Sequence, residues 1–307
     1  MQKQNTRINP ISNVRNLFLT LAIGSTLFTT SCMEGGEGVE KEIPSNDTIT
    51  KSATMFEVEG KVFSIPSPIQ TALLLKESGS AFNKDILNAT SNVSKYTAST
   101  KKALNLGIYG ADLGYVTIFE ETQSSIAYLA VSKSLANDLG ISNIFNESLL
   151  ARYEKNISYK DSLLNLVSDA FRATDRFLKQ NNQENLGALI LAGGWIETLY
   201  LTTKITNIES NQKIINRIGE QKITIENLMK LLMSLNESAE VTLLLSQLND
   251  LKDTFSQVEY SYTYIASTVD EANKTTTINS TSSTTINKET LGLITSKVNN
   301  IRNSIIQ

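Results

Sequence analysis

The chain has 307 residues, 40% of them hydrophobic and 19% charged, which is enough apolar material for one good core or two small ones. It contains no histidine and a single cysteine, Cys32, so an internal disulfide and a zinc site built on Cys and His are excluded. The same counts exclude Ser-His-Asp and Cys-His catalysis, so any catalysis has to rest on carboxylates, Lys, Tyr, Ser or Thr.

The first thirty-one residues have the pattern of a secretory signal peptide. Lys3, Arg7 and Arg15 form a basic start without an acidic residue, and an apolar run of 12 residues follows at Leu17–Phe28. A bilayer-spanning helix needs about 20 apolar residues. The run is therefore too short to span a membrane, and we expect residues 1–31 to be removed.

Cys32 follows the small residues Thr29, Thr30 and Ser31 at the end of this run. The pattern resembles the lipobox of bacterial lipoproteins, although leucine usually stands where this chain has Thr29. The resemblance implies a diacylglycerol thioether on Cys32, cleavage that makes Cys32 the new N-terminus, and attachment to the outer membrane through fatty acids such as palmitate. The alternative is an ordinary secretory signal with an incidental cysteine.

Residues 32–59 are expected to form a flexible acidic tether. Residues 33–59 carry seven acids and two lysines, and they are rich in Gly, Ser and Thr with few large apolar residues. Acids just after the lipidated cysteine resemble the surface-export signal of some outer-membrane lipoproteins, and the alternative is a solvated spacer. We expect the domain to face the periplasm or the cell surface, with the surface slightly favoured.

Residues 60–307 are expected to form a single helical domain. The stretch Phe56–Ile65 alternates weakly and predicts a short hairpin or an extended lead-in. A helix should then begin with Ser67 as N-cap and Pro68 in its first position, and end near Gly79. Helical periodicity recurs in eight further stretches, namely 93–121, 122–139, 149–156, 161–179, 184–204, 212–236, 237–259 and 287–307. The fold class predicted is an all-α, multi-helix antiparallel bundle.

A small β addition is predicted near the C-terminus. Tyr260, Tyr262 and Tyr264 alternate in a segment rich in β-branched residues, which favours a β-hairpin. Such a tyrosine row can bind sugars or partners, but we expect it to be the half-buried face of a strand.

The predicted helix 93–121 contains the stretch GIYGADLGYVTIF, whose only charge is Asp112. Gly107, Gly110 and Gly114 share one helix face, and three glycines there predict that another helix backbone passes close. On a helical wheel Asp112 falls roughly opposite that face. Because the helix is apolar on nearly all sides, we expect it to be central.

The stretch from Leu186 to Thr203 behaves in the same way, with Glu197 as its only charge. Its length approaches that of a membrane span, but Gly193, Gly194 and Glu197 in its middle favour a buried helix. The two glycines precede Glu197 by one turn and leave room beside its carboxylate.

The two lone carboxylates suggest a shared polar pocket. Such a pair could bind a cation or a sugar-like ligand, or act as acid and base, because desolvation and a second acid both raise a carboxyl pKa. The alternative is that each acid is satisfied by Arg, Lys, hydroxyl or backbone partners. The candidate pocket residues are Asp112, Glu197, Tyr109, Tyr115, Trp195 and Tyr200.

For function the sequence indicates a lipid-anchored envelope protein with a non-enzymatic role in binding an envelope protein or ligand. The mature part resembles the small helical lipoproteins of unknown function of bacterial outer membranes, a resemblance that implies no activity. The alternatives are a carboxylate-based enzyme acting on envelope glycans or peptidoglycan, and a purely structural envelope protein. Residues 60–307 hold 23 basic and 24 acidic residues, so we expect no nucleic-acid partner, and no motif predicts a cofactor or metal site.

Overall fold

The computed structural model describes residues 54–58, 61–65, 68–145, 147–156, 183–205, 208–235 and 238–307, with scattered positions between 159 and 180. The predicted signal peptide, Cys32 with most of its tether, and Ser67 lie outside the described residues. So does most of the helix predicted for 161–179.

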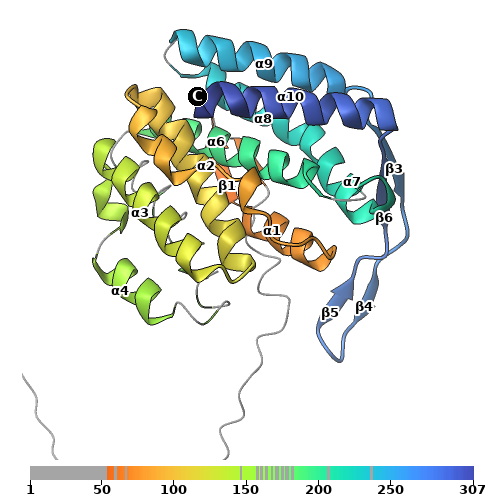
Figure 1. Ribbon diagram of the computed structural model, residues 1–307. Coiled ribbons are helices and arrows are strands. Elements are labelled where there is room, and N and C mark those ends of the chain that lie inside the picture. The colour runs from red at the N-terminus through yellow and green to blue at the C-terminus, as the bar shows by residue number, and fades with distance from the viewer. Residues whose placement is uncertain are drawn as a thin grey trace, which may run out of the picture. The chain divides into compact units, whose positions relative to one another are not determined.

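The described part of the chain is a helical bundle with small antiparallel β additions, so the predicted fold class is confirmed (Figure 1). The described helices follow the predicted order along the chain. They are α1 (Pro68–Glu77), α2 (Ser99–Ile118), α3 (Thr122–Asp138), α4 (Glu147–Lys155), α6 (Glu184–Thr203), α7 (Gln212–Gly219), α8 (Gln221–Met233), α9 (Ala239–Phe255) and α10 (Lys288–Ile306).

Local side-chain chemistry sets several helix ends. Asn287 accepts a hydrogen bond from the Thr290 backbone N–H at 2.8 Å and caps the N-terminus of α10. Gly79 and Gly140 follow α1 and α3 with φ of +81° and +73°, in the left-handed conformation that glycine adopts at little cost. The helix ends predicted at these two glycines are therefore confirmed.

Two predicted helices are each broken into two, which corrects the prediction from periodicity. The stretch 93–121, expected as one long or kinked helix, holds the end of a short 3₁₀ turn, η3 (Thr90–Lys95), and then α2. Between them lies the buried Tyr96, whose hydroxyl accepts a hydrogen bond from Asn88. The stretch 212–236 divides into α7 and α8. Gly219, the last residue of α7, lies directly against the Thr284 side chain of the β addition.

The centre of the bundle is the contact between α2 and α6 (Figure 1). A Cβ atom built on Gly107 would lie 1.9 Å from the Ile190 carbonyl oxygen, and one on Gly193 would lie 1.9 Å from the Leu104 carbonyl oxygen. The two backbones thus touch, as predicted at Gly107. Gly114 instead faces α1, where Ile69 Cγ1 is the nearest atom. The glycines predicted on one face of the helix therefore contact two different helices.

Helix α6 is the one described helix long and apolar enough to cross a membrane. Within the bundle, however, 83% of its apolar window is buried. It is covered by α1, α2, α8 and α10, which identifies it as the core helix that the sequence predicts.

The β additions are ribbons of two strands. An N-terminal hairpin pairs β1 (Thr54–Val58) with β2 (Lys61–Ile65), which is the hairpin form of the two predicted alternatives. Residues 259–285 form a second, longer structure, here called the β arm, in which β3 (Glu259–Thr263) pairs with β6 (Thr281–Thr285). Farther out, β4 (Thr268–Asp270) pairs with β5 (Thr275–Thr277), and Figure 1 shows this end reaching away from the helices.

The predicted hairpin is confirmed, but the prediction that its tyrosines form a half-buried face is wrong. Tyr262 and Tyr264 are 67% and 74% exposed. A half-buried strand needs a second layer against one face. Among the described elements none covers the arm beyond its root, and alternation along a strand carries no information about such a layer.

Candidate functional site

The two lone carboxylates lie side by side at the centre of the bundle. Asp112 of α2 and Glu197 of α6 are both 0% exposed, and their carboxyl groups lie within hydrogen-bonding reach of each other, a bond that requires a proton on one of them. The glycine contact brings the backbones of α2 and α6 close together, which places the two acids within reach of each other. The helical wheel predicts that Asp112 lies opposite the glycine face of α2. In the structure Gly107 and Asp112 nevertheless both lie against α6.

The main partner of Glu197 is Arg302 of α10. Its Nε and Nη2 atoms donate to the two carboxylate oxygens at 2.6 and 2.9 Å, and Nη2 also donates to the Ile86 carbonyl at 3.0 Å. The guanidinium lies over the Tyr200 ring, 4.1 Å from its centre. A two-pronged, buried contact of this kind holds Glu197 as the carboxylate.

Asp112 is the member of the pair that holds a proton. Burial, and then the Glu197 charge, raise the pKa of Asp112 well above its usual range. Burial also raises the pKa of Glu197, but Arg302 opposes that rise. An ionised Asp112 would leave its buried Oδ1 without a partner, whereas a protonated one donates to Glu197. Its Oδ2 accepts the Asn88 backbone N–H at 3.1 Å.

Asn88 connects the acid pair to the segment 83–96, which crosses α2. Its side-chain Nδ2 donates to the Tyr96 hydroxyl at 3.0 Å and to Asn105 Oδ1 at 3.2 Å. Its carbonyl accepts the Tyr128 hydroxyl at 3.0 Å, and the neighbouring Ala89 carbonyl accepts the Tyr109 hydroxyl at 2.9 Å. The segment is thus held to α2 and α3 by buried polar contacts.

We use the name acid network for Asp112, Glu197, Arg302 and Asn88. Of the four aromatic residues predicted beside the acids, two belong there. Tyr200 lies under Arg302, and the Tyr109 hydroxyl donates to the Ala89 carbonyl beside Asn88. Burial, then Tyr96 and to a smaller extent Asp112, raise the pKa of the Tyr109 hydroxyl.

The other two predicted aromatic residues have different surroundings. Tyr115 stacks with Phe82 at 5.7 Å between ring centres, and its hydroxyl accepts the Asn83 backbone N–H. Trp195 points to α8, where its Nε1 donates to Gln221 Oε1 at 2.8 Å. The two rings are therefore packing elements of the core, not parts of the acid network.

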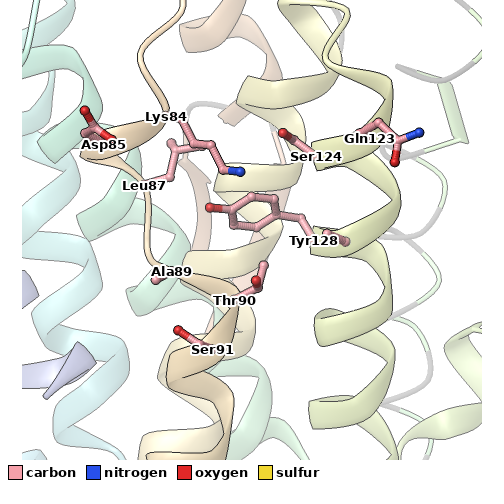
Figure 2. A pocket seen from close by; sticks show the side chains of 10 residues that line it. Lys84, Asp85, Leu87, Ala89, Thr90, Ser91, Gln123, Ser124 and Tyr128 are labelled. Carbon is pink, nitrogen blue, oxygen red and sulfur yellow. The ribbon is translucent and has the colours of Figure 1, made fainter.

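Arg302 is bound to Glu197 and lies near Asp112, at the place where the sequence predicts a pocket. A groove of about 510 Å³ lies elsewhere among the described residues, between the segment 83–96 and α3 (Figure 2). None of the six predicted pocket residues lines it. Tyr128 lies between the groove and the acid network, since its ring lines the groove and its hydroxyl donates to the Asn88 carbonyl.

Arg302 was missed because it lies 105 residues after Glu197. A signal was present, however. Arg302 stands four residues after Val298 and next to Ile301, so it belongs to the apolar face of its helix, where it is 4% exposed. A charge on an apolar face requires a buried counter-charge, and Glu197 was one of two candidates.

The acid network has the chemistry of a structural element. Its carboxylate, guanidinium and amide groups are paired with one another, and both acids are closed to solvent. Among the described residues no group of three or more His, Cys, Asp or Glu is placed to hold a metal ion.

Comparison of the chain with protein-family models, with curated proteins and with solved structures finds no match.

Proposed function

We propose that this chain is a lipid-anchored protein of the bacterial cell envelope with a non-enzymatic binding role, and that the β arm is its docking surface. The anchor is inferred from the lipobox-like residues before Cys32. The observation that carries the binding role is the exposure of large apolar side chains on an arm whose root is firmly attached.

The outer part of the arm exposes apolar side chains on a narrow ribbon. Tyr264, Val269 and Ile278 are 74%, 65% and 79% exposed, and Tyr262 and Ile265 add to the same ribbon. Single exposed apolar residues are ordinary, but several on one projecting element mark an interaction site. Tyrosine in particular supplies contact area at a low entropic cost.

The root of the arm is built into the helices. The Thr284 backbone N–H donates to Asn216 Oδ1 at 3.0 Å, and its carbonyl accepts from Gln212 Nε2 at 2.8 Å. The Tyr260 hydroxyl donates to the Gly219 carbonyl at the end of α7. A fixed root holds the outer strands in place before a partner arrives, which lowers the entropic cost of binding.

The partner that fits the arm is an apolar surface of another envelope protein. Residues 259–286 carry three acids and one lysine. This small net charge favours neither a strongly charged protein partner nor a charged lipid surface. Among the described residues, β4 and β5 form a sheet of only two strands. The outer edge of each strand can therefore pair with an extended segment of the partner.

The geometry of the acid pair does not favour the enzymatic alternative. Glycosidase carboxyls lie about 5 to 9.5 Å apart with the substrate between them. Asp112 and Glu197 touch each other, are both 0% exposed, and share Arg302 as their neighbouring charge.

Anchoring is tested by feeding cells an alkyne fatty acid and comparing the full chain with Cys32→Ser. The expected result is a labelled parent in the membrane fraction and an unlabelled variant outside it. Ser31→Ala, which keeps a small residue beside the cysteine, should retain the label. Label that persists in Cys32→Ser would overturn the anchor.

Docking is tested with a photo-crosslinking amino acid placed at position 264 or 278 in the lipidated chain in cells. The matched controls are positions 223 and 243 on α8 and α9, where Ile223 and Leu243 are 63% and 56% exposed. We expect one discrete adduct from the arm positions and none from the controls. The absence of arm adducts, or equal adducts from all four positions, would contradict the proposal.

A further inference from the structure

The groove between the segment 83–96 and α3 is the one open cavity described in this part of the fold, and nothing in the acid network or the β arm uses it. Its volume of about 510 Å³ is in the range of small-molecule sites. Much of its lining is polar, with Lys84, Thr90, Ser91 and Ser124 around the ring of Tyr128 (Figure 2).

The first turn of α3 borders this groove. Helix N-termini carry unpaired backbone N–H groups and a partial positive charge, which together favour an anion. Within the described residues no side chain caps α3, and no hydrogen bond reaches the backbone N–H of Gln123 or Ser124. The Thr122 and Ser125 N–H groups, in contrast, are satisfied by the Glu120 and Glu121 carbonyls.

Two side chains provide a second, independent indication of a ligand. Ser124 is only 9% exposed, and its hydroxyl forms none of the hydrogen bonds found among the described residues. Its oxygen is not enclosed by protein but opens into the groove. Figure 2 shows this hydroxyl turned into the groove, toward the ammonium group of Lys84. Lys84 takes part in none of the salt bridges found in the part of the chain that the structure describes. Asp85 also belongs to the lining, but Figure 2 shows its carboxylate directed away from Lys84.

We propose that this groove binds a small hydroxylated oxyanion of the class of sugar phosphates. The oxyanion lies between the Lys84 ammonium, the Ser124 hydroxyl and the free N–H groups of α3. The hydroxylated part occupies the remaining volume beside Thr90 and Ser91. A bare oxyanion would leave most of that volume to water.

The site is supported from below by the acid network. The Tyr128 hydroxyl is hydrogen-bonded to the Asn88 carbonyl, and the Asn88 N–H is hydrogen-bonded to Asp112. The wall and floor of the groove are therefore fixed before a ligand binds. This inference is independent of the β arm, which lies in a different part of the chain.

Titration calorimetry of the mature domain with glucose 6-phosphate, inorganic phosphate and glucose tests the proposal. We expect saturable binding of glucose 6-phosphate, binding of inorganic phosphate weaker by about tenfold, and no measurable binding of glucose. Lys84→Met should weaken glucose 6-phosphate binding by about tenfold or more, and Ser124→Ala by several fold. Asp85→Asn should strengthen it, because the variant removes the only carboxylate of the lining.

The matched control is Lys95→Met, which removes an exposed lysine of the same segment outside the groove. It should bind as the parent does, and circular dichroism should show all variants folded. Absence of saturable glucose 6-phosphate binding, or binding that Lys84→Met leaves unchanged, would overturn the site. Equal affinity for phosphate and glucose 6-phosphate would overturn the sugar part.

Discussion

The acid network and the β arm depart from the usual distribution of side chains in opposite directions. At the centre, Glu197 and Arg302 are 0% and 4% exposed although both are charged. On the arm, Tyr264 and Ile278 are 74% and 79% exposed although both are large and mostly apolar. Charged groups are rarely buried and apolar groups are rarely gathered on a projecting ribbon, so each region needs a compensating partner.

The two regions differ in where that partner is found. The network is complete within the chain, since Arg302 is bound to Glu197 and to the Ile86 carbonyl, and Asp112 to Asn88. Among the described residues, the partners found for the outer strands belong to the arm itself. A buried charge that is satisfied internally stabilises one arrangement of helices, whereas an exposed apolar surface points to a partner outside the chain.

The strongest test of this contrast is Glu197→Gln. The variant removes the counter-charge of Arg302, which stays buried and ionised, and we expect a loss of about 3 to 5 kcal/mol in the free energy of unfolding. Urea denaturation measures this loss. Glu226→Gln, which changes an exposed acid on α8, should have an effect within about 0.5 kcal/mol. A Glu197→Gln variant as stable as the parent would mean that the ion pair does not hold α6 and α10 together.

The next largest effect is expected for Gly193→Ala, because the added Cβ would lie 1.9 Å from the Leu104 carbonyl oxygen. The helices must then separate, at a cost of about 3 kcal/mol for overpacking against a backbone. Gly292→Ala in α10 is the control, since its Cβ meets nothing within 4 Å. That variant should gain about 1 kcal/mol from helix propensity. Similar effects at the two glycines would contradict the close contact of α2 with α6.

The variant Asp112→Asn tests whether Asp112 holds the proton of the acid pair, because the free energy of unfolding of variant and parent should then depend differently on pH. Asparagine reproduces the protonated acid, because its amide N–H donates to Glu197 and its oxygen accepts from Asn88. The raised pKa of Asp112 means that its contribution to stability is full below its unfolded pKa, about 3.9, and falls as the pH rises toward the folded pKa. Asparagine does not titrate, so its advantage over the parent should grow with pH.

The difference in free energy of unfolding between Asp112→Asn and the parent should grow by about 1.4 kcal/mol per pH unit. This holds over the pH range in which Asp112 is protonated in the folded parent but ionised in the unfolded chain. Unfolding free energies of parent and Asp112→Asn between pH 4 and pH 7 measure it, and groups common to both proteins cancel. A difference that stays constant with pH would show that Asp112 is ionised in the folded protein.

The sequence was most informative where a pattern within one helix predicts that helix's burial or its contact with another helix. An apolar helix with a single charge predicts a buried position, and the glycines around position 107 predict a close helix contact. A meeting of Asp112 and Glu197 was therefore available as a hypothesis, beside the alternative that each acid has its own partners. Arg302 could not be assigned to them with the same certainty. Its partner is set by how α10 packs on α6, which no spacing along the chain reports.

The aromatic residues show the same limit. Trp195 lies two residues before Glu197, yet its indole points to Gln221 on α8, because neighbours in a helix face different directions. The buried Tyr96 is likewise bound by Asn88, eight residues away and across the turn η3. The tyrosines of the arm alternate as a half-buried strand would, but only the fold decides whether a second layer covers them.

The smallest effect is expected for a shortened arm. Replacing residues 266–279 by Asn-Gly joins Ile265 to Ser280, which are already close because the Ile265 N–H donates to Ser280 Oγ at 3.1 Å. The contacts given for the outer strands among the described residues lie within the arm, so the free energy of unfolding should change by no more than about 0.5 kcal/mol. Val258→Ala at the root, where Val258 is 1% exposed, should cost about 2 kcal/mol. A loss above about 1 kcal/mol in the shortened arm would show that its outer strands stabilise the fold, and their exposed side chains would then no longer point to a partner.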